Sequence, residues 1–367
     1  QDAIKRQMVS DVPICTFLSG GVDSSVVSAV CAAELKKQGK KLTTFSFDFI
    51  DNDKYFKANS FQPSQDRPYV DKMVSFLDSD HHYLECDNKM QADLLYRSVD
   101  AHDLPCMADI DSSLQYFCEE VSHSHKVVLT GECADEVFGG YPWFHREEML
   151  NSGTFPWTPS LTPRKVLVKD DLVESLHMDE YVKMIYDRSV SEINVLPSEN
   201  EIETNRRRIG YLNIRFFMQT LLNRMDRTSM FSGLEARVPF ADRTLVDYVF
   251  NIPWEMKAKD GLVKNILRQA SKGLLPDEIL FRRKSPYPKT YNPYYENLLA
   301  KRLKEVLSDS ASPLHSLLDL KQVTQFLENP KDYGAPWYGQ LMAGPQMIAY
   351  LLQIEYFLRK YNVSIRI

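Results

Sequence analysis

The chain has 367 residues, 44% of them apolar, so it can bury a sizeable core and hold roughly two domains. A formal net charge of −6 argues against a general nucleic-acid or membrane surface. No apolar run is long enough to cross a bilayer and no signal peptide is visible, so we expect a cytoplasmic protein with no membrane and no nucleic acid as partner.

The cysteine pattern indicates free thiols. All six cysteines stand singly, mostly in apolar or helical segments, as in proteins of a reducing compartment. Two histidine pairs, His81-His82 and His123/His125, invite a metal site, but neither has cysteine or carboxylate ligands clustered beside it. We therefore interpret the two pairs as a strand edge and a helix end.

In the first part of the chain, strand and helix patterns alternate. Apolar runs and period-two alternation predict strands at 14–18, 41–49, 82–86 and 126–130. Helical periodicity and end signals predict helices at 23–37, 69–77, 87–101 and 110–121. Strands that alternate with helices need right-handed crossovers, so we predict an α/β fold with a doubly wound parallel sheet of about five strands.

The rest of the chain reads as α-rich. Residues 143–200 indicate only loops and helices, and a strong helical pattern returns at 202–222. Further helices are predicted at 242–251, 263–272 and 345–361. We therefore expect a parallel-sheet core over 1–142 and a mostly helical part over 143–367.

The first strand stops abruptly at Ser19-Gly20-Gly21, and a helix begins at once. Glycines in such a turn let backbone N–H groups approach a ligand closely, which binds an anion at a helix N-terminus. The turn lacks the ending of a Walker A loop and the third glycine of a dinucleotide fingerprint. Ser-Gly-Gly-x-Asp-Ser instead resembles the pyrophosphate (PP) loop of the N-type ATP pyrophosphatases. An ordinary strand-to-helix turn is the alternative interpretation.

A cluster of acidic residues follows the strand at 126–130, in the run Gly131-Glu132-Cys133-Ala134-Asp135-Glu136. Ligands of open parallel sheets bind at the carboxyl ends of strands, so we expect this run to lie beside the Ser-Gly-Gly loop. Three carboxylates next to a phosphate site repel one another unless a cation neutralises them, and Mg²⁺ is the natural candidate. A solvated acidic helix start is the alternative.

Two further segments carry charges in unusual places. Between 224 and 237, charged residues alternate with apolar ones, so they are expected to be partly buried and to need partners or a polyanionic ligand. The run Arg282-Arg283-Lys284 lies between an apolar stretch and a proline, so it is expected on a constrained loop that can direct one of its charges toward a ligand. A structural Arg–carboxylate network and a solvated basic loop are the respective alternatives.

In this order, the motifs resemble the synthetase half of glutamine-hydrolysing asparagine synthetases, and the resemblance spans nearly the whole chain. It implies an AMP-forming carbon–nitrogen ligase. MgATP would adenylate the side-chain carboxylate of aspartate, and ammonia would displace AMP to give asparagine. Ammonia would come from a glutaminase domain upstream in the full-length protein, because Gln1 falls where the linker or first helix of the synthetase half is expected.

The resemblance also implies roles for individual residues. Glu132 would receive ammonia and manage its proton, Lys284 would stabilise the pentavalent phosphorus, and Arg227 occupies a position where some relatives carry lysine. Magnesium would be held by Asp23 and Asp135. ATP and pyrophosphate would contact Phe17, Leu18, Ser19, Gly20, Gly21, Asp23, Ser24, Phe47, Thr130 and Gly131. Further charges of the site would be Glu136, Glu235 and Arg237.

Two other functions stay open at this point. Related adenylating cyclases, such as β-lactam synthetases and lasso-peptide cyclases, share the scaffold and use a tyrosine–glutamate dyad on a larger carboxylate. Cys133 stands where a small residue is usual, which leaves the size of the carboxylate open. A catalytically silent module that binds ATP without releasing AMP is the second alternative. The oligomeric state is also open, with a homodimer as one option.

Overall fold

The computed structural model describes residues 1–58, 62–329 and 343–366. The chain forms two compact units, each assembled from three separate stretches. The sheet unit consists of Gln1–Cys86, Leu114–His145 and Asn213–Tyr291. The helical unit consists of Asp87–Ser113, Arg146–Leu212 and Asn292–Ile367. Among the described residues, no helix is both long enough and apolar enough to span a bilayer.

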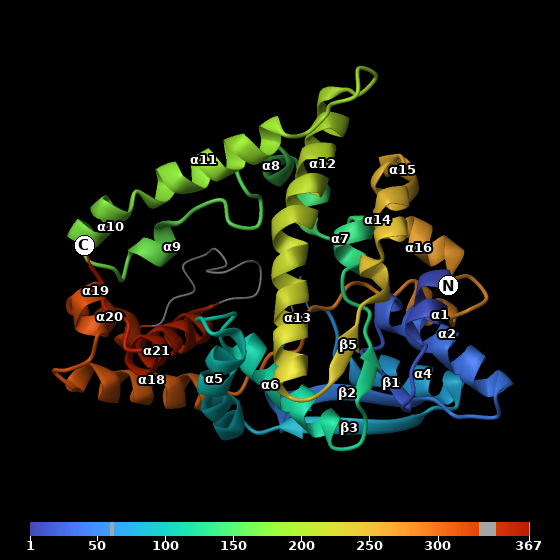
Figure 1. The fold of residues 1–367 in the computed structure, drawn as a ribbon, viewed down its shortest axis with the longest axis horizontal. Helices are drawn as coiled ribbons and strands as arrows, with labels where there is room; N and C mark the ends of the chain where they lie inside the picture. The colour runs from blue at the N-terminus through green and yellow to red at the C-terminus, as the bar shows by residue number, and fades with distance from the viewer. Residues whose placement is uncertain (59–61, 330–342, 367) are drawn as a thin grey trace. The chain divides into compact units, whose positions relative to one another are not determined.

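The sheet unit is built on five strands that are all parallel, in the order β3-β2-β1-β4-β5. Figure 1 shows them side by side at the lower right of the view. The strands are β1 (Ile14–Phe17), β2 (Thr43–Phe49), β3 (Asp80–Cys86), β4 (Val127–Leu129) and β5 (Glu235–Arg237). The prediction of an α/β fold with about five parallel strands is confirmed, although β5 falls where the sequence analysis recognised only charges.

The strand order reverses between β1 and β4. From β1 the chain proceeds to β2 and β3 on one side, and β4 and β5 are added on the other side. The register pairs Thr16 of β1 with Leu129 of β4, so the two strands end at nearly the same level. Such a reversal leaves a crevice at the carboxyl ends of the two central strands, which is where open α/β sheets bind ligands.

Both faces of the sheet are covered by apolar side chains, as expected for parallel strands. Alternate strand residues therefore enter two different cores. Ile14, Val127 and Leu129 pack with α2 and α4 on one face. Cys15, Phe45, Phe47 and Val128 pack with α6 and α13 on the other. These helices are α2 (Val22–Lys37), α4 (Arg67–Leu77), α6 (Asp109–Ser122) and α13 (Gln219–Phe231).

Short helices complete the sheet unit and carry the loops at its strand ends. They are α1 (Asp2–Gln7), α3 (Asn52–Tyr55), α7 (Ala134–Phe138), α14 (Arg243–Phe250), α15 (Trp254–Lys257), α16 (Asn265–Ala270) and α17 (Asp277–Leu280). Two 3₁₀ turns, Pro142–Phe144 and Pro239–Ala241, and a π-helical turn, Asn213–Met218, belong to the same unit. The π-helical turn interrupts the single helix that we predicted at 202–222.

The helical unit has its own core, in which α21 packs against α5 and α18. Fully buried leucines and isoleucines from the three helices meet there, including Leu95, Leu299, Leu303, Ile348 and Leu352. Its helices are α5 (Asn88–His102), α8 (Glu147–Leu150), α9 (Thr162–Lys165), α10 (Asp170–Leu176), α11 (Met178–Ser191), α12 (Glu201–Leu212), α18 (Pro293–Ser308), α19 (Leu314–Leu317), α20 (Leu320–Glu328) and α21 (Gly344–Lys360).

Candidate active site

The Ser-Gly-Gly turn joins β1 directly to α2. The Ser19 hydroxyl lies 3.0 Å from the Ser24 hydroxyl, and the Ser19 N–H donates to Ser24 Oγ at 3.1 Å. Gly20 has φ +69°, and a Cβ there would lie 2.7 Å from Tyr69 Cβ. Only glycine fits this position, because any side chain would be strained and would collide with α4. The turn is therefore fixed in a shape that presents backbone amides at the start of a sixteen-residue helix.

The acidic loop lies against this turn. It connects β4 to α7, and a Cβ on Gly131 would lie 2.4 Å from the backbone nitrogen of Ser24. A side chain at Gly131 would therefore push the two loops apart. The expectation that the acidic loop lies beside the Ser-Gly-Gly loop agrees with this contact. Asp23 of one loop and Asp135 of the other are close enough to share the ammonium group of Lys264.

Two aspartates and two lysines form one contact network, which we call the acid–lysine cluster. Lys264 Nζ lies 2.6 Å from Asp23 Oδ2 and 2.8 Å from Asp135 Oδ1. Lys284 Nζ lies 2.5 Å from Asp135 Oδ2 and 3.9 Å from the centroid of the Tyr141 ring. The Lys264 side chain is only 3% exposed, so its charge depends on these two carboxylates.

The pKa values within the cluster follow from burial and mutual charge. Burial lowers the pKa of Lys264, but Asp135 and Asp23 outweigh it, and the net shift is upward. Burial raises the pKa of Asp135, yet Lys264 and Lys284 outweigh it, and the net shift is downward. For Asp23, burial outweighs Lys264 and the pKa is raised. Asp135 is thus the carboxylate that the two lysines hold most firmly in its charged form.

The carboxylates of the acid–lysine cluster, together with the neighbouring Glu132, offer oxygen donors that fit a magnesium ion. Asp23 Oδ1 and Glu132 Oε2 are buried and have no hydrogen-bond partner among residues 1–58, 62–329 and 343–366. In the same described part of the chain, the Lys264 ammonium group is the one ion-pair partner of Asp135 Oδ1, which makes no well-aligned hydrogen bond. Unpartnered buried carboxylate oxygens are costly, and hard oxygen ligands of this kind are what Mg²⁺ prefers.

The other two acidic residues of the loop each have a specific partner. Glu132 Oε1 accepts from Arg224 Nη2 at 2.5 Å, and Arg224 is buried on α13. Glu136 Oε1 accepts from the Tyr141 hydroxyl at 2.5 Å. Burial and the neighbouring Asp135 raise the pKa of Glu136 to about 7. Arg227, which we predicted as catalytic, lies one turn further along α13 and is exposed.

Arg282 connects the basic loop to the phosphate loop. Its Nη1 donates to the Ser19 carbonyl oxygen at 2.9 Å, its Nη2 pairs with Asp66, and its guanidinium lies 4.0 Å above the Tyr69 ring. The Arg282 side chain is 2% exposed. Since Lys284 follows two residues later, this anchoring fixes where the lysine can reach.

Aromatic side chains line the strand ends next to the loops. Phe17 of β1 stacks on Phe117, with ring centroids 4.2 Å apart. Phe47 of β2 lies nearly parallel to Tyr287, with centroids 6.0 Å apart. Leu18 is 1% exposed and its side chain belongs to the core, so only its backbone can face a ligand.

Two predicted site charges, Glu235 and Arg237, pair with each other on β5. Arg237 Nε donates to Glu235 Oε1 at 2.7 Å, and Arg237 Nη1 donates to the carbonyl oxygens of Gln7 and Val9, each at 2.6 Å. Arg237 therefore holds the segment after α1. Among the described residues, no hydrogen bond or ion pair joins these two side chains to the acid–lysine cluster, although the Arg237 carbonyl oxygen accepts from the Thr130 N–H at 2.9 Å.

Sequence reasoning missed Lys264, Arg224 and Arg282 as partners of the acidic and phosphate loops. In the structure, Lys264 has φ 56° and lies just before α16. The one signal in the sequence is that this lysine follows two apolar residues, which only weakly indicates a buried charge. Arg224 belongs to the charged segment at 224–237, but the sequence does not show which side of its helix faces Glu132. Arg282 was part of the basic triplet, in which we selected Lys284 alone.

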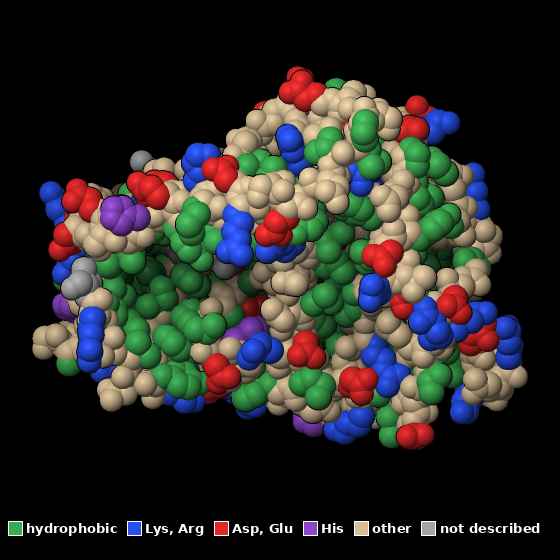
Figure 2. Space-filling view, turned by 45° about the horizontal axis from the view of Figure 1, so that its top comes forward, with side chains coloured by type: hydrophobic (Ala, Val, Ile, Leu, Met, Phe, Trp, Pro, Cys, Tyr) green, Lys and Arg blue, Asp and Glu red, His purple; other side chains and the backbone are tan. Residues whose placement is uncertain are grey.

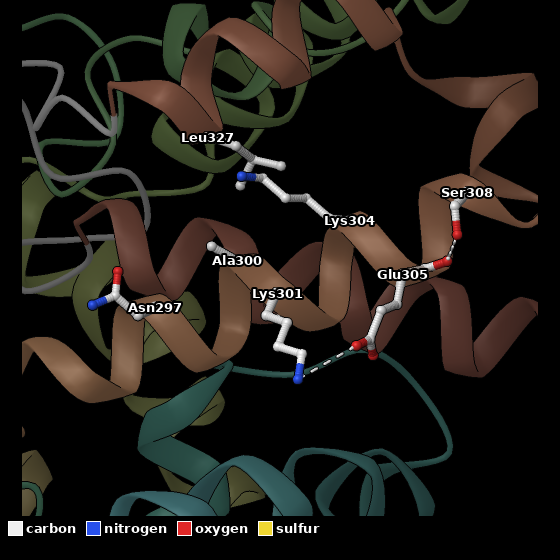
Figure 3. A pocket seen from close by; sticks show the side chains of 7 residues that line it. All are labelled: Asn297, Ala300, Lys301, Lys304, Glu305, Ser308 and Leu327. Atoms are coloured by element: carbon white, nitrogen blue, oxygen red, sulfur yellow. Dashed lines mark hydrogen bonds and ion pairs between the residues drawn. The ribbon is translucent and has the colours of Figure 1, made fainter.

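A pocket of about 490 Å³ occurs in the helical unit. Figure 3 shows that it is lined mainly by α18, with an ion pair between Lys301 and Glu305. It contains none of the predicted site residues. On the face seen in Figure 2, Lys and Arg side chains are interspersed with Asp and Glu, so no extended surface of one charge is present there.

We expect Gly131→Ala to lower the melting temperature, because its methyl group would overlap the Ser24 backbone and force the loops apart, at a cost of about 1–3 kcal/mol. Gly21→Ala is the matched control, since its Cβ would meet only Ser19 Oγ at 3.5 Å. Thermal unfolding measures the melting temperatures of both variants and of the parent protein. Equal melting temperatures for Gly131→Ala and the parent protein would contradict the close contact of the two loops.

Comparison with known proteins gives a consistent picture. A family model described as "Asparagine synthase" matches residues 1–359. The chain is 49% identical over 367 residues to "Asparagine synthetase [glutamine-hydrolyzing] 3" of Bacillus subtilis (strain 168), which covers 100% of this chain and 59% of that protein. It is 26% identical over 293 residues to the Rattus norvegicus "Asparagine synthetase [glutamine-hydrolyzing]", covering 78% of this chain and 41% of the rat protein.

A relative with a different name has a similar level of identity. The chain is 27% identical over 347 residues to "Amidase chyE" of Penicillium rubens, covering 78% of this chain and 50% of that protein. The chain thus spans about half the length of the curated relatives that it matches.

Proposed function

Since the chain belongs to the asparagine synthase family, we propose that it activates the side-chain carboxylate of aspartate with ATP and transfers the acyl group to ammonia. The observation that carries this proposal is the acid–lysine cluster. Two loops at the strand reversal supply its carboxylates beside a glycine turn, and later segments of the chain supply its two lysines. Such an arrangement suits a reaction that moves phosphate charge while a magnesium ion is bound.

In the proposed first step, a carboxylate oxygen of aspartate attacks the α-phosphorus of ATP. A phosphorus–oxygen bond forms, the bond to the bridging oxygen breaks, and pyrophosphate leaves. The amides of Gly20 and Gly21 and the hydroxyls of Ser19 and Ser24 bind the leaving group. Lys284 stabilises the charge that develops on the phosphorus oxygens.

Magnesium would be held by Asp23 and Asp135 and would neutralise charge on the phosphates of ATP. Lys264 keeps the two carboxylates close together when the protein is free, because its buried ammonium group contacts both. The adenosine would lie at the strand ends, bordered by Phe17, Phe47 and the Thr130-Gly131 backbone. This assignment is supported by the ring contacts at the same edge of the sheet.

In the proposed second step, ammonia attacks the acyl carbon. A carbon–nitrogen bond forms, the carbon–oxygen bond to AMP breaks, and the nitrogen loses a proton. Glu132 is suited to accept this proton, because Arg224 holds Oε1 while Oε2 has no partner among the described residues. We infer that a glutaminase domain supplies the ammonia in the full-length protein, because the similar synthetases are named as glutamine-hydrolyzing.

The cyclase alternative has one observation in its favour, the contact between Tyr141 and Glu136. Both side chains lie next to the cluster, and a tyrosine–glutamate pair is what those enzymes use. The similar proteins named as asparagine synthetases nevertheless favour aspartate as the carboxylate.

Product analysis tests the proposal directly. With aspartate, ATP, Mg²⁺ and ammonium, we expect the chain to form asparagine, AMP and pyrophosphate in equal amounts. Release of ADP and phosphate, or no asparagine from a folded protein, would contradict it. Release of AMP only with larger carboxylates would favour the cyclase function, and ATP binding without turnover would favour a silent module.

We expect Lys284→Met to reduce the turnover number on the order of a hundredfold, because a charge aimed at the developing transition state is lost. ATP binding should change little, since the glycine turn is intact. Arg283→Met is the matched control, because Arg283 is the exposed neighbour on the same loop. Steady-state kinetics measure the turnover number of each variant. An equal reduction of the turnover number in the two variants would mean that Lys284 has no special role.

A further inference from the structure

A second group of ligating side chains lies in the helical unit, at the connection between α5 and α6. It comprises His102, the last residue of α5, Cys106 in the connecting loop, and Asp111 in the first turn of α6. One ligand atom from each of the three side chains lies within 4.8 Å of the other two. None of these residues takes part in the proposed reaction.

The imidazole of His102 is oriented by a backbone group. Its Nδ1 lies 2.9 Å from the carbonyl oxygen of Ser98, one turn earlier in α5. A carbonyl oxygen only accepts, so Nδ1 carries the proton and Nε2 keeps its lone pair. Metal-binding histidines are typically fixed in this way by a hydrogen bond from the second ring nitrogen.

The sulfur of Cys106 accepts a hydrogen bond from a buried amide. Gln353 Nε2 on α21 lies 3.2 Å from Cys106 Sγ and 3.0 Å from Ser98 Oγ, and Gln353 Oε1 accepts from the Cys106 N–H at 3.2 Å. Gln353 is fully buried. An N–H group directed at sulfur favours the thiolate, which is the form that binds a metal. Burial and the neighbouring Asp111 outweigh this contact and raise the pKa of the Cys106 thiol, so metal binding would displace the thiol proton.

Asp111 provides the clearest sign of a missing partner. Its side chain is fully buried, and Oδ2 accepts from the Met107 N–H at 2.5 Å. Oδ1 is buried and has no hydrogen-bond partner among the described residues. A buried carboxylate oxygen of this kind calls for a cation.

We propose that His102, Cys106 and Asp111 bind a zinc ion, with a water molecule as fourth ligand. Nitrogen, sulfur and oxygen ligands together suit zinc, whereas magnesium and calcium prefer oxygen alone. Tetrahedral zinc places such ligand atoms roughly 3.3–3.6 Å apart, so small side-chain rotations complete the site. The ion would link the end of α5 to the start of α6, where the connecting loop has two residues with positive φ, Asp103 and Ala108.

Cobalt(II) is the probe, because it replaces zinc and reports sulfur ligation by absorption. We expect the metal-free 367-residue chain, titrated in excess Mg²⁺ to occupy the acid–lysine cluster, to bind one cobalt ion with a thiolate-to-cobalt band. Stoichiometric zinc should remove this band. Asp111→Asn should weaken cobalt binding roughly tenfold or more, because a charged ligand becomes neutral.

Cys106→Ser should abolish the band, whereas Cys31→Ala, which removes a buried thiol of the sheet unit, should retain it. Circular dichroism establishes that each variant is folded. A folded parent chain that gives no sulfur band with stoichiometric cobalt would overturn the proposal. A band that persists in Cys106→Ser would overturn the proposal as well. If a variant does not fold, the titration of the parent chain tests the proposal on its own.

Discussion

The site depends on one constraint, the burial of Lys264 between Asp23 and Asp135. A lysine that is 3% exposed needs both carboxylates, and the carboxylates come from two different loops. The loops can approach only because Gly131 leaves room for the backbone at Ser24. The ion pairs of Lys264 and the absence of a side chain at Gly131 therefore act together. If the loops were apart, the buried charges would lose their partners and destabilise the fold.

The strand order explains why these loops meet. The chain leaves β1 toward one edge of the sheet and returns through β4 on the other side, so the turns that follow both strands share one crevice. Segments much later in the chain then add the positive charges. Lys264, Arg282 and Lys284 all belong to the last stretch of the sheet unit, and Arg282 secures that stretch to the phosphate loop.

The sequence predicted what is encoded locally. Four strands, the four helices that alternate with them and the glycine turn follow from periodicity and turn chemistry, and the ends of these elements agree with the structure to within about two residues. The helix predicted at 202–222 instead continues through a π-helical turn to Phe231, and α11 and α18 were not predicted as separate helices. The three-residue strand β5 and the interleaving of the two units were not predicted, because both depend on distant partners. The same holds for Arg224, whose contact with Glu132 depends on the rotation of α13. The roles of Arg227, Glu235 and Arg237 stay predictions.

The central claim is that aspartate is activated by attack on the α-phosphorus, and the fate of one oxygen atom tests it. Aspartate labelled with oxygen-18 in its side-chain carboxylate would be supplied with ATP, Mg²⁺ and ammonium, and the products analysed by mass spectrometry. The account predicts one labelled oxygen in AMP for each asparagine formed, because the bridging oxygen leaves with the nucleotide. Label in inorganic phosphate, or unlabelled AMP alongside asparagine, would contradict it.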